Sequence, residues 1–198
     1  MLVQKSMKRA LISVYDKIGI VEFVKGLKKN GFSVISTGGT LKTLEDGNVG
    51  DVVHVSEITG FPEILDGRVK TVHPKLLGGI LALRDNKVHM IELKRHKILS
   101  IDLVVCNFYP FKKVTDQSAD MKTALECIDI GGPNMIRTAA KNFQDVVVVV
   151  NPKRYNQILK EYKQNGEVTL KTRKALATEA FKKTAQYDRT IYRFLKSA

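Results

Sequence analysis

The sequence predicts an α/β domain, a three-layer sandwich with a mainly parallel sheet and helices on both of its faces. Short apolar and β-branched runs alternate with helical segments along the chain, and this alternation is typical of parallel strands joined by helices. Some runs, above all residues 145–150, have no polar alternation, which indicates strands buried on both faces. The length of 198 residues fits one such domain.

The first half of the chain is expected to contain strands at residues 9–14, 32–36 and 52–55. A helix should run from Ile20 to Asn30, because apolar residues recur there at helical spacing until an Asn-Gly pair ends the pattern. A shorter helix is expected from the turn at residues 37–40 to Gly47. Residues 56–75 lack periodicity and contain two glycines and two prolines, so an irregular loop is expected there.

The second half is expected to contain strands at residues 79–83, 102–108 and 145–150, and helices at residues 87–97, 120–127 and 133–142. The strand at 102–108 is the most apolar and should be central. The end of the chain should be helical, with one apolar stripe formed by Leu176, Ala177, Ala180, Phe181, Thr184, Ile191, Phe194 and Leu195. In a parallel sheet of this kind, ligands bind beyond the carboxyl ends of the strands.

The chain is strongly basic: 33 Lys and Arg against 20 Asp and Glu give a formal charge of +13. The charge lies mainly on lysines spread along the whole chain, which favours a lysine-rich solvated surface, with attraction of a small anionic substrate as the alternative. Nucleic-acid binding is disfavoured, because no recognition motif or ladder of aromatic residues accompanies the basic residues.

Neither a membrane segment nor a metal site is expected. The longest aliphatic run, residues 146–150, is far shorter than the ~20 residues of a membrane helix, and the N-terminus does not read as a signal peptide. Cys106 and Cys127 have no metal-ligand spacing, and two cysteines with four scattered histidines suit the reducing cytoplasm.

The turn at residues 36–40 (STGGT) combines glycines and hydroxyls between a strand and a helix. Glycine lets the backbone approach an anion, and amides at a helix start bind it, so the turn is a phosphate-site candidate; an ordinary tight turn is the alternative. Lys17, after the first strand, offers a positive charge to the same phosphate, or simply lies near a helix start.

Residues 67–74 (GRVKTVHP) place two cations at alternate positions. Arg68 and Lys70 should therefore point the same way in an extended loop, either towards an anion or into solvent. His73, which precedes a proline, fits a structural role better than a catalytic one.

Two later turns also carry chemical groups. Asn107 and Tyr109 bring an amide and a phenol to the end of the central strand. Residues 129–133 (DIGGP) then open a helix, with a proline that suits the first helical position and amides that can donate to an oxyanion. Lys141, near the end of that helix, is by position alone a residue that complements the helix dipole.

Seven motifs, in this order, carry a resemblance to a known family: residues 36–40 (STGGT), 60–63 (GFPE), 67–71 (GRVKT), 73–74 (HP), 107–111 (NFYPF), 129–133 (DIGGP) and 139–142 (AAKN). Over residues 8–196 the sequence resembles the inosine monophosphate cyclohydrolase domain of the bifunctional purine-biosynthesis protein, which has the methylglyoxal-synthase-like fold. The resemblance implies closure of the purine ring of 5-formamidoimidazole-4-carboxamide ribotide to inosine monophosphate, with loss of water. It implies no metal or redox cofactor.

The resemblance also implies residue roles. Lys141 corresponds to the acid/base lysine, and Lys70, Tyr109 and Asp129 to supporting catalytic residues. Contacts with the nucleotide are implied for Tyr15, Asp16, Lys17, Thr37, Gly38, Gly39, Thr40, Arg68, Val69, Thr71, Cys106, Asn107 and Ile130. The family usually has serine where Tyr15 stands, so a hydroxyl contact with phosphate is expected to be lost or rearranged.

We expect residues 1–198 to form one cyclohydrolase domain, with residues 1–7 as a flexible extension and without the formyltransferase domain that normally follows. The sequence is compatible with a free-standing enzyme and with an excised domain, and it is also compatible with a homodimer. Methylglyoxal synthase is disfavoured because its pattern lacks the NFYP and DIGGP segments. A non-catalytic nucleotide sensor is disfavoured because the four candidate catalytic residues are all retained, and an RNA-binding module rests on charge alone.

Overall fold

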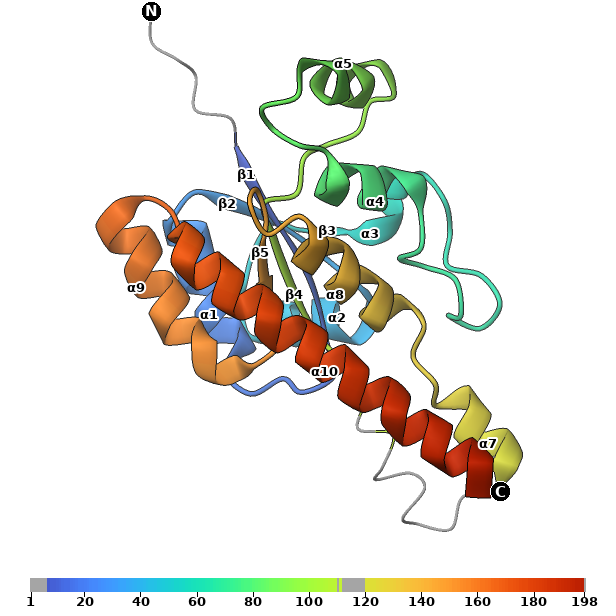
Figure 1. Cartoon of the computed structure of the whole chain (residues 1–198). Coiled ribbons are helices and arrows are strands. Elements are labelled where there is room, and N and C mark those ends of the chain that lie inside the picture. The colour runs from blue at the N-terminus through green and yellow to red at the C-terminus, as the bar shows by residue number, and fades with distance from the viewer. Residues whose placement is uncertain (1–6, 110, 112–119, 198) are drawn as a thin grey trace, which may run out of the picture.

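The structure is a computed structural model that describes residues 7–109, 111 and 120–197 (Figure 1). Its centre is a five-stranded sheet, paired in parallel throughout, in the order β3-β2-β1-β4-β5. The strands are β1 (Lys8–Val14), β2 (Phe32–Ser36), β3 (Val52–His54), β4 (Leu103–Asn107) and β5 (Val147–Val149). The chain builds outward from β1 to β3 and then returns to β4 on the other side of β1, so the strand order reverses between β1 and β4.

Helices cover both faces of the sheet, which confirms the three-layer sandwich (Figure 1). On one face, α1 (Ile20–Lys29) packs against α9 (Tyr155–Asn165) and beside α2 (Gly38–Asp46). On the other face lie α4 (Pro74–Leu81) and α8 (Gly131–Lys141), and α10 (Leu170–Ser197) runs along α8 and β5. The remaining short elements are α3 (Val55–Thr59), α5 (Lys87–Arg95), α7 (Met121–Glu126) and the 3₁₀ helix η1 (Pro152–Arg154).

The core lies on both faces of the sheet, as the unbroken apolar runs predict. The side chains of β5 are all buried, and so are those of β4 from Leu103 to Cys106. Helix α1 contributes Phe23 and Leu27, which are completely enclosed. Burial of both sheet faces leaves the strand ends as the places where polar groups of the sheet reach solvent.

The expected strand at residues 79–83 is wrong, because most of these residues belong to α4. Pro74 occupies the first turn of this helix, and His73 caps it by accepting the Lys75 N–H at Nδ1, 3.1 Å away. The apolar segment is too short for its periodicity to distinguish a helix from a strand. Gly79 is where α4 meets the chain that leads into β4: a Cβ there would collide with the carbonyl of Leu99.

The irregular loop expected at residues 56–75 is also partly wrong, because it begins with α3. His54 and Glu57 form a capping box around the start of this helix, a pairing that a histidine cap hides from sequence rules written for Ser or Thr. On α10, Phe181 and Leu195 of the expected stripe are exposed, whereas Tyr187, which was not expected, is buried. The proposed N-terminal extension, residues 1–7, lies outside the described residues except for Met7.

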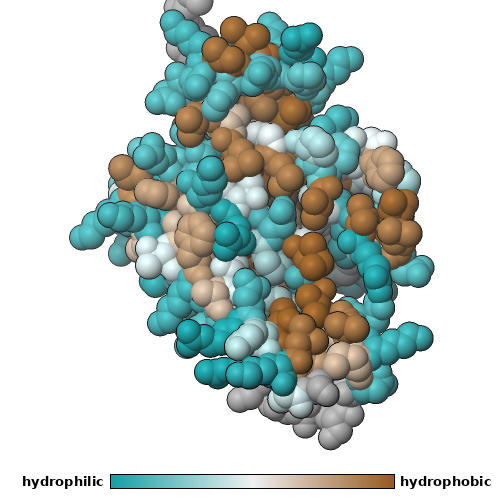
Figure 2. All heavy atoms as spheres, turned by 45° about the vertical axis from the view of Figure 1, so that its right-hand side comes forward, coloured by the Kyte–Doolittle hydropathy of each residue, from teal (hydrophilic) through white to brown (hydrophobic). Residues whose placement is uncertain are grey.

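The surface is mixed in character. Figure 2 shows hydrophobic patches among hydrophilic side chains on one face of the molecule. Exposed apolar side chains include Val88 and Ile91 on α5 and Leu125 on α7. Across the described residues, no helix combines the length and the apolar character needed to cross a membrane.

Candidate active site

A cavity of about 740 Å³ lies at the carboxyl ends of β1, β2 and β4. The strand order reverses here, which is where α/β sheets of this kind bind ligands. The walls come from the turns after these three strands, from residues 66–68 and 70–71, and from residues 125–132, which lead from the end of α7 into the start of α8. All the turns selected from the sequence therefore meet at one cavity.

The turn after β2 presents open backbone to this cavity. Thr37 is extended and precedes α2, and Gly38 enters the helix with a φ of +25°. Gly38 and Gly39 are exposed, and a Cβ on either would meet no atom within 4 Å. Amides at a helix start lack intrahelical partners, so this surface can receive an anion such as phosphate.

Hydroxyls of this turn fasten it to the end of β1. The Thr40 hydroxyl accepts the N–H of Val14 and donates to the carbonyl of Val14, each at 3.0 Å. The hydroxyls of Thr37 and Ser13 lie 2.9 Å apart. Thr40 has already used its single donor, so its contribution to the site is to position α2 against β1.

Lys17 and Asn107 organise the turn after β1. The Lys17 ammonium donates to the carbonyls of Val14 and Tyr15, which uses two of its three donors. Burial lowers the pKa of Lys17, and the charge of Asp16 opposes this shift. Asn107 accepts the amides of Tyr15 and Asp16 at Oδ1, each at 2.8 Å, and thereby holds the turn that carries Lys17.

Two cations, Arg68 and Lys70, reach the cavity from the loop before α4, so they share a side as their alternate spacing predicts. Arg68 pairs with Glu126 of α7, and the Lys70 Nζ lies 3.7 Å from Glu63 Oε1. Each cation is thus balanced by a carboxylate near the cavity.

The turn that carries Arg68 has an unusual backbone. Leu65 and Asp66 have φ values of +53° and +52°, which non-glycine residues rarely adopt. Gly67 follows at +87°, where a Cβ would collide with the Glu63 carboxylate. The backbone pairing of Ile64 with Val69 closes this turn.

Asp129 is held firmly at the start of α8. Its Oδ1 accepts the Gly132 N–H at 2.8 Å, and its own amide donates to the Tyr187 Oη at 2.8 Å. A Cβ on Gly132 would collide with the Asp129 carboxylate, and one on Gly131 would collide with the Thr71 hydroxyl. Both glycines are therefore required for this close packing.

A phenol and a thiol complete the site. The rings of Tyr15 and Tyr109 meet edge to face with centroids 4.5 Å apart, and Tyr15 is 52% exposed. Cys106 is buried, and its Sγ lies 3.8 Å from the carbonyl of Gly132. Burial and the charge of Asp129 raise the pKa of Cys106, so the thiol stays protonated and is a poor nucleophile.

Most of the residues selected from the sequence line this cavity, but four do not: Asp16, Gly38, Val69 and Lys141. The first three are sequence neighbours of lining residues. Lys141 is exposed at the last position of α8, ten residues beyond Gly131, and this separation corresponds to about 15 Å along a helix.

Two residues near the site were missed by sequence reasoning. Tyr187 lies three residues after Thr184 on the buried stripe of α10, so helical spacing predicts its burial but not its bond to Asp129. Glu126 carries no signal of its own in the sequence. Among the described residues, no group of three or more His, Cys, Asp and Glu side chains is placed to hold a metal ion.

Comparisons with known proteins agree with this geometry. Residues 19–134 match the model of the MGS-like domain, and residues 139–198 match that of the AICARFT/IMPCHase bienzyme. The chain is 53% identical to the bifunctional purine biosynthesis protein PurH of Acetivibrio thermocellus over 190 residues, and 53% identical to that of Bacillus mycoides over 189 residues. These matches cover 96% and 95% of the chain but 37% of each relative, so the chain spans just over a third of their length.

A solved structure is also similar. The crystal structure of ForH superposes with a TM-score of 0.82 at 34% sequence identity, covering 94% of this chain and 98% of that one.

Proposed function

Because the chain belongs to the MGS-like domain family, and because its motifs resemble those of inosine monophosphate cyclohydrolases, we propose that it closes the purine ring of 5-formamidoimidazole-4-carboxamide ribotide to give inosine monophosphate and water. One observation carries the proposal. The cavity at the reversal of strand order joins an anion-binding turn to Lys70, Tyr109 and Asp129.

The cavity suits a nucleotide in size and charge. Its volume of about 740 Å³ lies within the usual range of small-molecule sites. We place the phosphate at the start of α2, where open glycine backbone and the Lys17 ammonium offer donors. The heterocycle then extends towards Asn107 and Asp129, on the β4 side of the cavity.

The reaction makes one carbon–nitrogen bond and removes one water. The carboxamide nitrogen, a poor nucleophile, attacks the formyl carbon, so the site must hold the two atoms in near-attack geometry. Asp129 accepts the proton that the nitrogen loses, while Lys70, Tyr109 and amides near Gly131 stabilise the oxygen that becomes a hydroxyl. The proton taken by Asp129 is passed to the oxyanion, which gives the hydroxyl. A general acid then protonates that hydroxyl, the C–O bond breaks and water leaves, while the former formamide nitrogen gives its N–H proton to the conjugate base of that acid, which leaves the ring C=N double bond.

Two lysines compete for the role of general acid. The resemblance favours Lys141, whereas the geometry favours Lys70, which lines the cavity. We retain Lys141 as the proposed acid/base residue and Lys70 as the oxyanion partner. Mutation of each lysine distinguishes between the two roles.

We propose that the formylated ribotide reaches this domain from a formyltransferase, either fused to it or separate. The longer relatives are bifunctional, which supports a second activity beside the one proposed for this domain. The cytoplasm is the proposed compartment, since Cys106 and Cys127 are both free thiols.

The direct test is an absorbance assay for inosine monophosphate, with purified protein, the formylated ribotide, and no metal or folate. We expect product well above the spontaneous rate, and the matched control Asp129→Asn, which replaces the carboxylate by a neutral amide of the same shape, should be strongly slowed but still measurable. Correctly folded protein that gives no more product than the buffer would overturn the proposed function.

A further inference from the structure

Tyr187 of α10 contacts two separate segments of the candidate active site, although it does not line the cavity. Its Oη accepts the amide of Asp129 at 2.8 Å and donates to the carbonyl of Cys127 at 3.4 Å. Its ring lies against Phe108 with centroids 4.3 Å apart, and Phe108 immediately precedes Tyr109. The side chain is only 6% exposed. One residue therefore joins the turn after β4 to the turn before α8.

The contact with Asp129 matters because it completes the fixation of that residue. The carboxylate is held by the Gly132 N–H, and the backbone amide is held by Tyr187. Loss of the phenol would free the amide end and allow the turn at residues 127–129 to move. A displacement of about 1 Å at a reacting group can cost about 10²-fold in rate.

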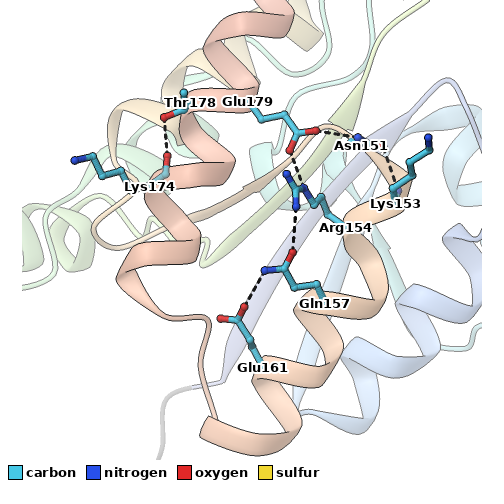
Figure 3. A network of polar contacts seen from close by, with 8 residues as sticks. All are labelled: Asn151, Lys153, Arg154, Gln157, Glu161, Lys174, Thr178 and Glu179. Atoms are coloured by element: carbon cyan, nitrogen blue, oxygen red, sulfur yellow. Dashed lines mark hydrogen bonds and ion pairs between the residues drawn. The ribbon is translucent and has the colours of Figure 1, made fainter.

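The helix that carries Tyr187 is itself anchored. Glu179, two turns earlier on α10, accepts hydrogen bonds from Asn151 at 2.8 Å and from Arg154 at 2.9 Å (Figure 3). The opposite end of α10 packs through Phe194 against Phe111, with ring centroids 5.5 Å apart. Anchored on both sides, α10 can impose a fixed position on the residues that Tyr187 contacts.

We propose that Tyr187 is a positioning residue for ring closure. Its hydroxyl fixes Asp129, and its ring fixes Phe108 and hence the approach of Tyr109. The inference rests on the proposed function above. Burial raises the pKa of Tyr187, so the phenol stays protonated and keeps donating to Cys127.

The test is Tyr187→Phe, which keeps the ring and removes only the hydroxyl. Tyr162→Phe is the matched control. Tyr162 is equally buried but packs on Phe32, the first residue of β2, and the cavity lies at the other end of that strand. We expect Tyr187→Phe to lower kcat by about tenfold to hundredfold, with KM changed by less than about threefold. Tyr162→Phe should match the wild type in kcat.

A merely structural role would lower stability without this pattern, so two further measurements accompany the kinetics. In an Asp129→Asn background, Tyr187→Phe should lower kcat little further, because the hydroxyl acts through Asp129. Hydrogen exchange of the Asp129 amide should be faster in Tyr187→Phe and unchanged in Tyr162→Phe.

The inference is overturned if Tyr187→Phe keeps the kcat of the control, if its effect multiplies fully with that of Asp129→Asn, or if exchange at Asp129 is unchanged. Hydrogen exchange needs no substrate. A wild-type protein without activity would therefore refute the proposed function, while exchange at Asp129 would still decide whether Tyr187 holds this turn.

Discussion

At the scale of single residues, Lys141 separates the proposed catalytic role from a purely structural one. It is exposed at the end of α8, and within the described residues it forms no ion pair. Its structural contribution therefore rests on the helix dipole, which is worth only about 0.3–1 kcal/mol at an exposed site.

We expect Lys141→Ala to leave the melting temperature almost unchanged and to lower kcat by at least about 10²-fold, as loss of a general acid does. The measurements are thermal melting and steady-state kinetics, with Lys153→Ala, another exposed lysine, as the control. Near-normal turnover together with reduced stability would assign Lys141 to the helix end and make Lys70 the proton donor.

Lys17 offers a second test at this scale. A phosphate contact is present in the ground state and in the transition state, so its loss weakens binding more than it slows the bound reaction. We expect Lys17→Ala to raise KM and the Kd of inosine monophosphate at least about tenfold, with kcat within about threefold.

Lys25→Ala is the control for Lys17→Ala, because Lys25 lies on α1 and pairs with Glu22 on the same helix. A defect of Lys17→Ala confined to kcat, with affinity unchanged, would contradict the phosphate position. Calorimetric titration with inosine monophosphate measures the affinity directly.

At the scale of secondary-structure elements, the contact of Asn151 and Arg154 with Glu179 anchors α10, the helix that carries Tyr187. Burial acts to raise the pKa of Glu179, but the hydrogen bonds from Asn151 and Arg154 outweigh it, and the pKa is lowered from its ordinary value of 4.5. A carboxyl with a lowered pKa in the folded state stabilises the fold above pH 4.5, and this contribution is lost as the pH falls through the lowered value.

We therefore expect Glu179→Gln to be less stable than the wild type at pH 7, by up to about 1 kcal/mol, as for other partly exposed ion pairs. The difference should shrink as the pH falls below 4.5. Chemical denaturation at several pH values measures it, and Glu167→Gln, in a looser pair with Arg173 at 3.7 Å, is the control. A difference that is constant with pH would show that the charge of Glu179 does not stabilise this contact.

The same scale shows which elements could be read from the sequence. Elements with several turns of periodicity or an unbroken apolar run, such as α1 and β5, were predicted correctly. Helix α4 was missed because its apolar segment is short and its cap is a histidine, and α3 was missed for the same second reason. Local signals were weak in both segments. In α4, the close packing of Gly79 against the chain at Leu99 is a tertiary contact that no local signal predicts.

Candidate site residues were easier to find than the contacts that hold them. Glycines and polar groups at strand ends could be located from the sequence, and the parallel topology then brought them to one cavity. The bond from Asp129 to Tyr187 joins residues 58 positions apart, and no spacing rule connects them. The position of Lys141 is different: the sequence already places it near the far end of the helix that opens at residues 131–133, and its absence from the cavity lining agrees with that distance.

At the scale of the whole molecule, the formal charge of +13 has to be reconciled with a small-molecule function. The chain exposes lysines on several helices, including α1 and α9 on one face of the sheet and α10 on the other. Figure 2 shows hydrophobic patches breaking up the hydrophilic surface of one face. A nucleic-acid site instead needs basic residues gathered on one face or along one groove.

We therefore expect only loose binding of nucleic acid, driven by the release of counterions from phosphates. Such binding falls steeply with salt: a protein that contacts 6–10 phosphates loses about 10³–10⁵-fold in affinity between 50 mM and 200 mM salt. Fluorescence anisotropy with labelled RNA and duplex DNA of several sequences, at both salt concentrations, tests this expectation. Affinities should be alike for all sequences and negligible at the higher salt, while inosine monophosphate still binds because its contacts lie inside the cavity. A sequence-selective complex that survives the higher salt would mean that the basic surface is a nucleic-acid site in its own right.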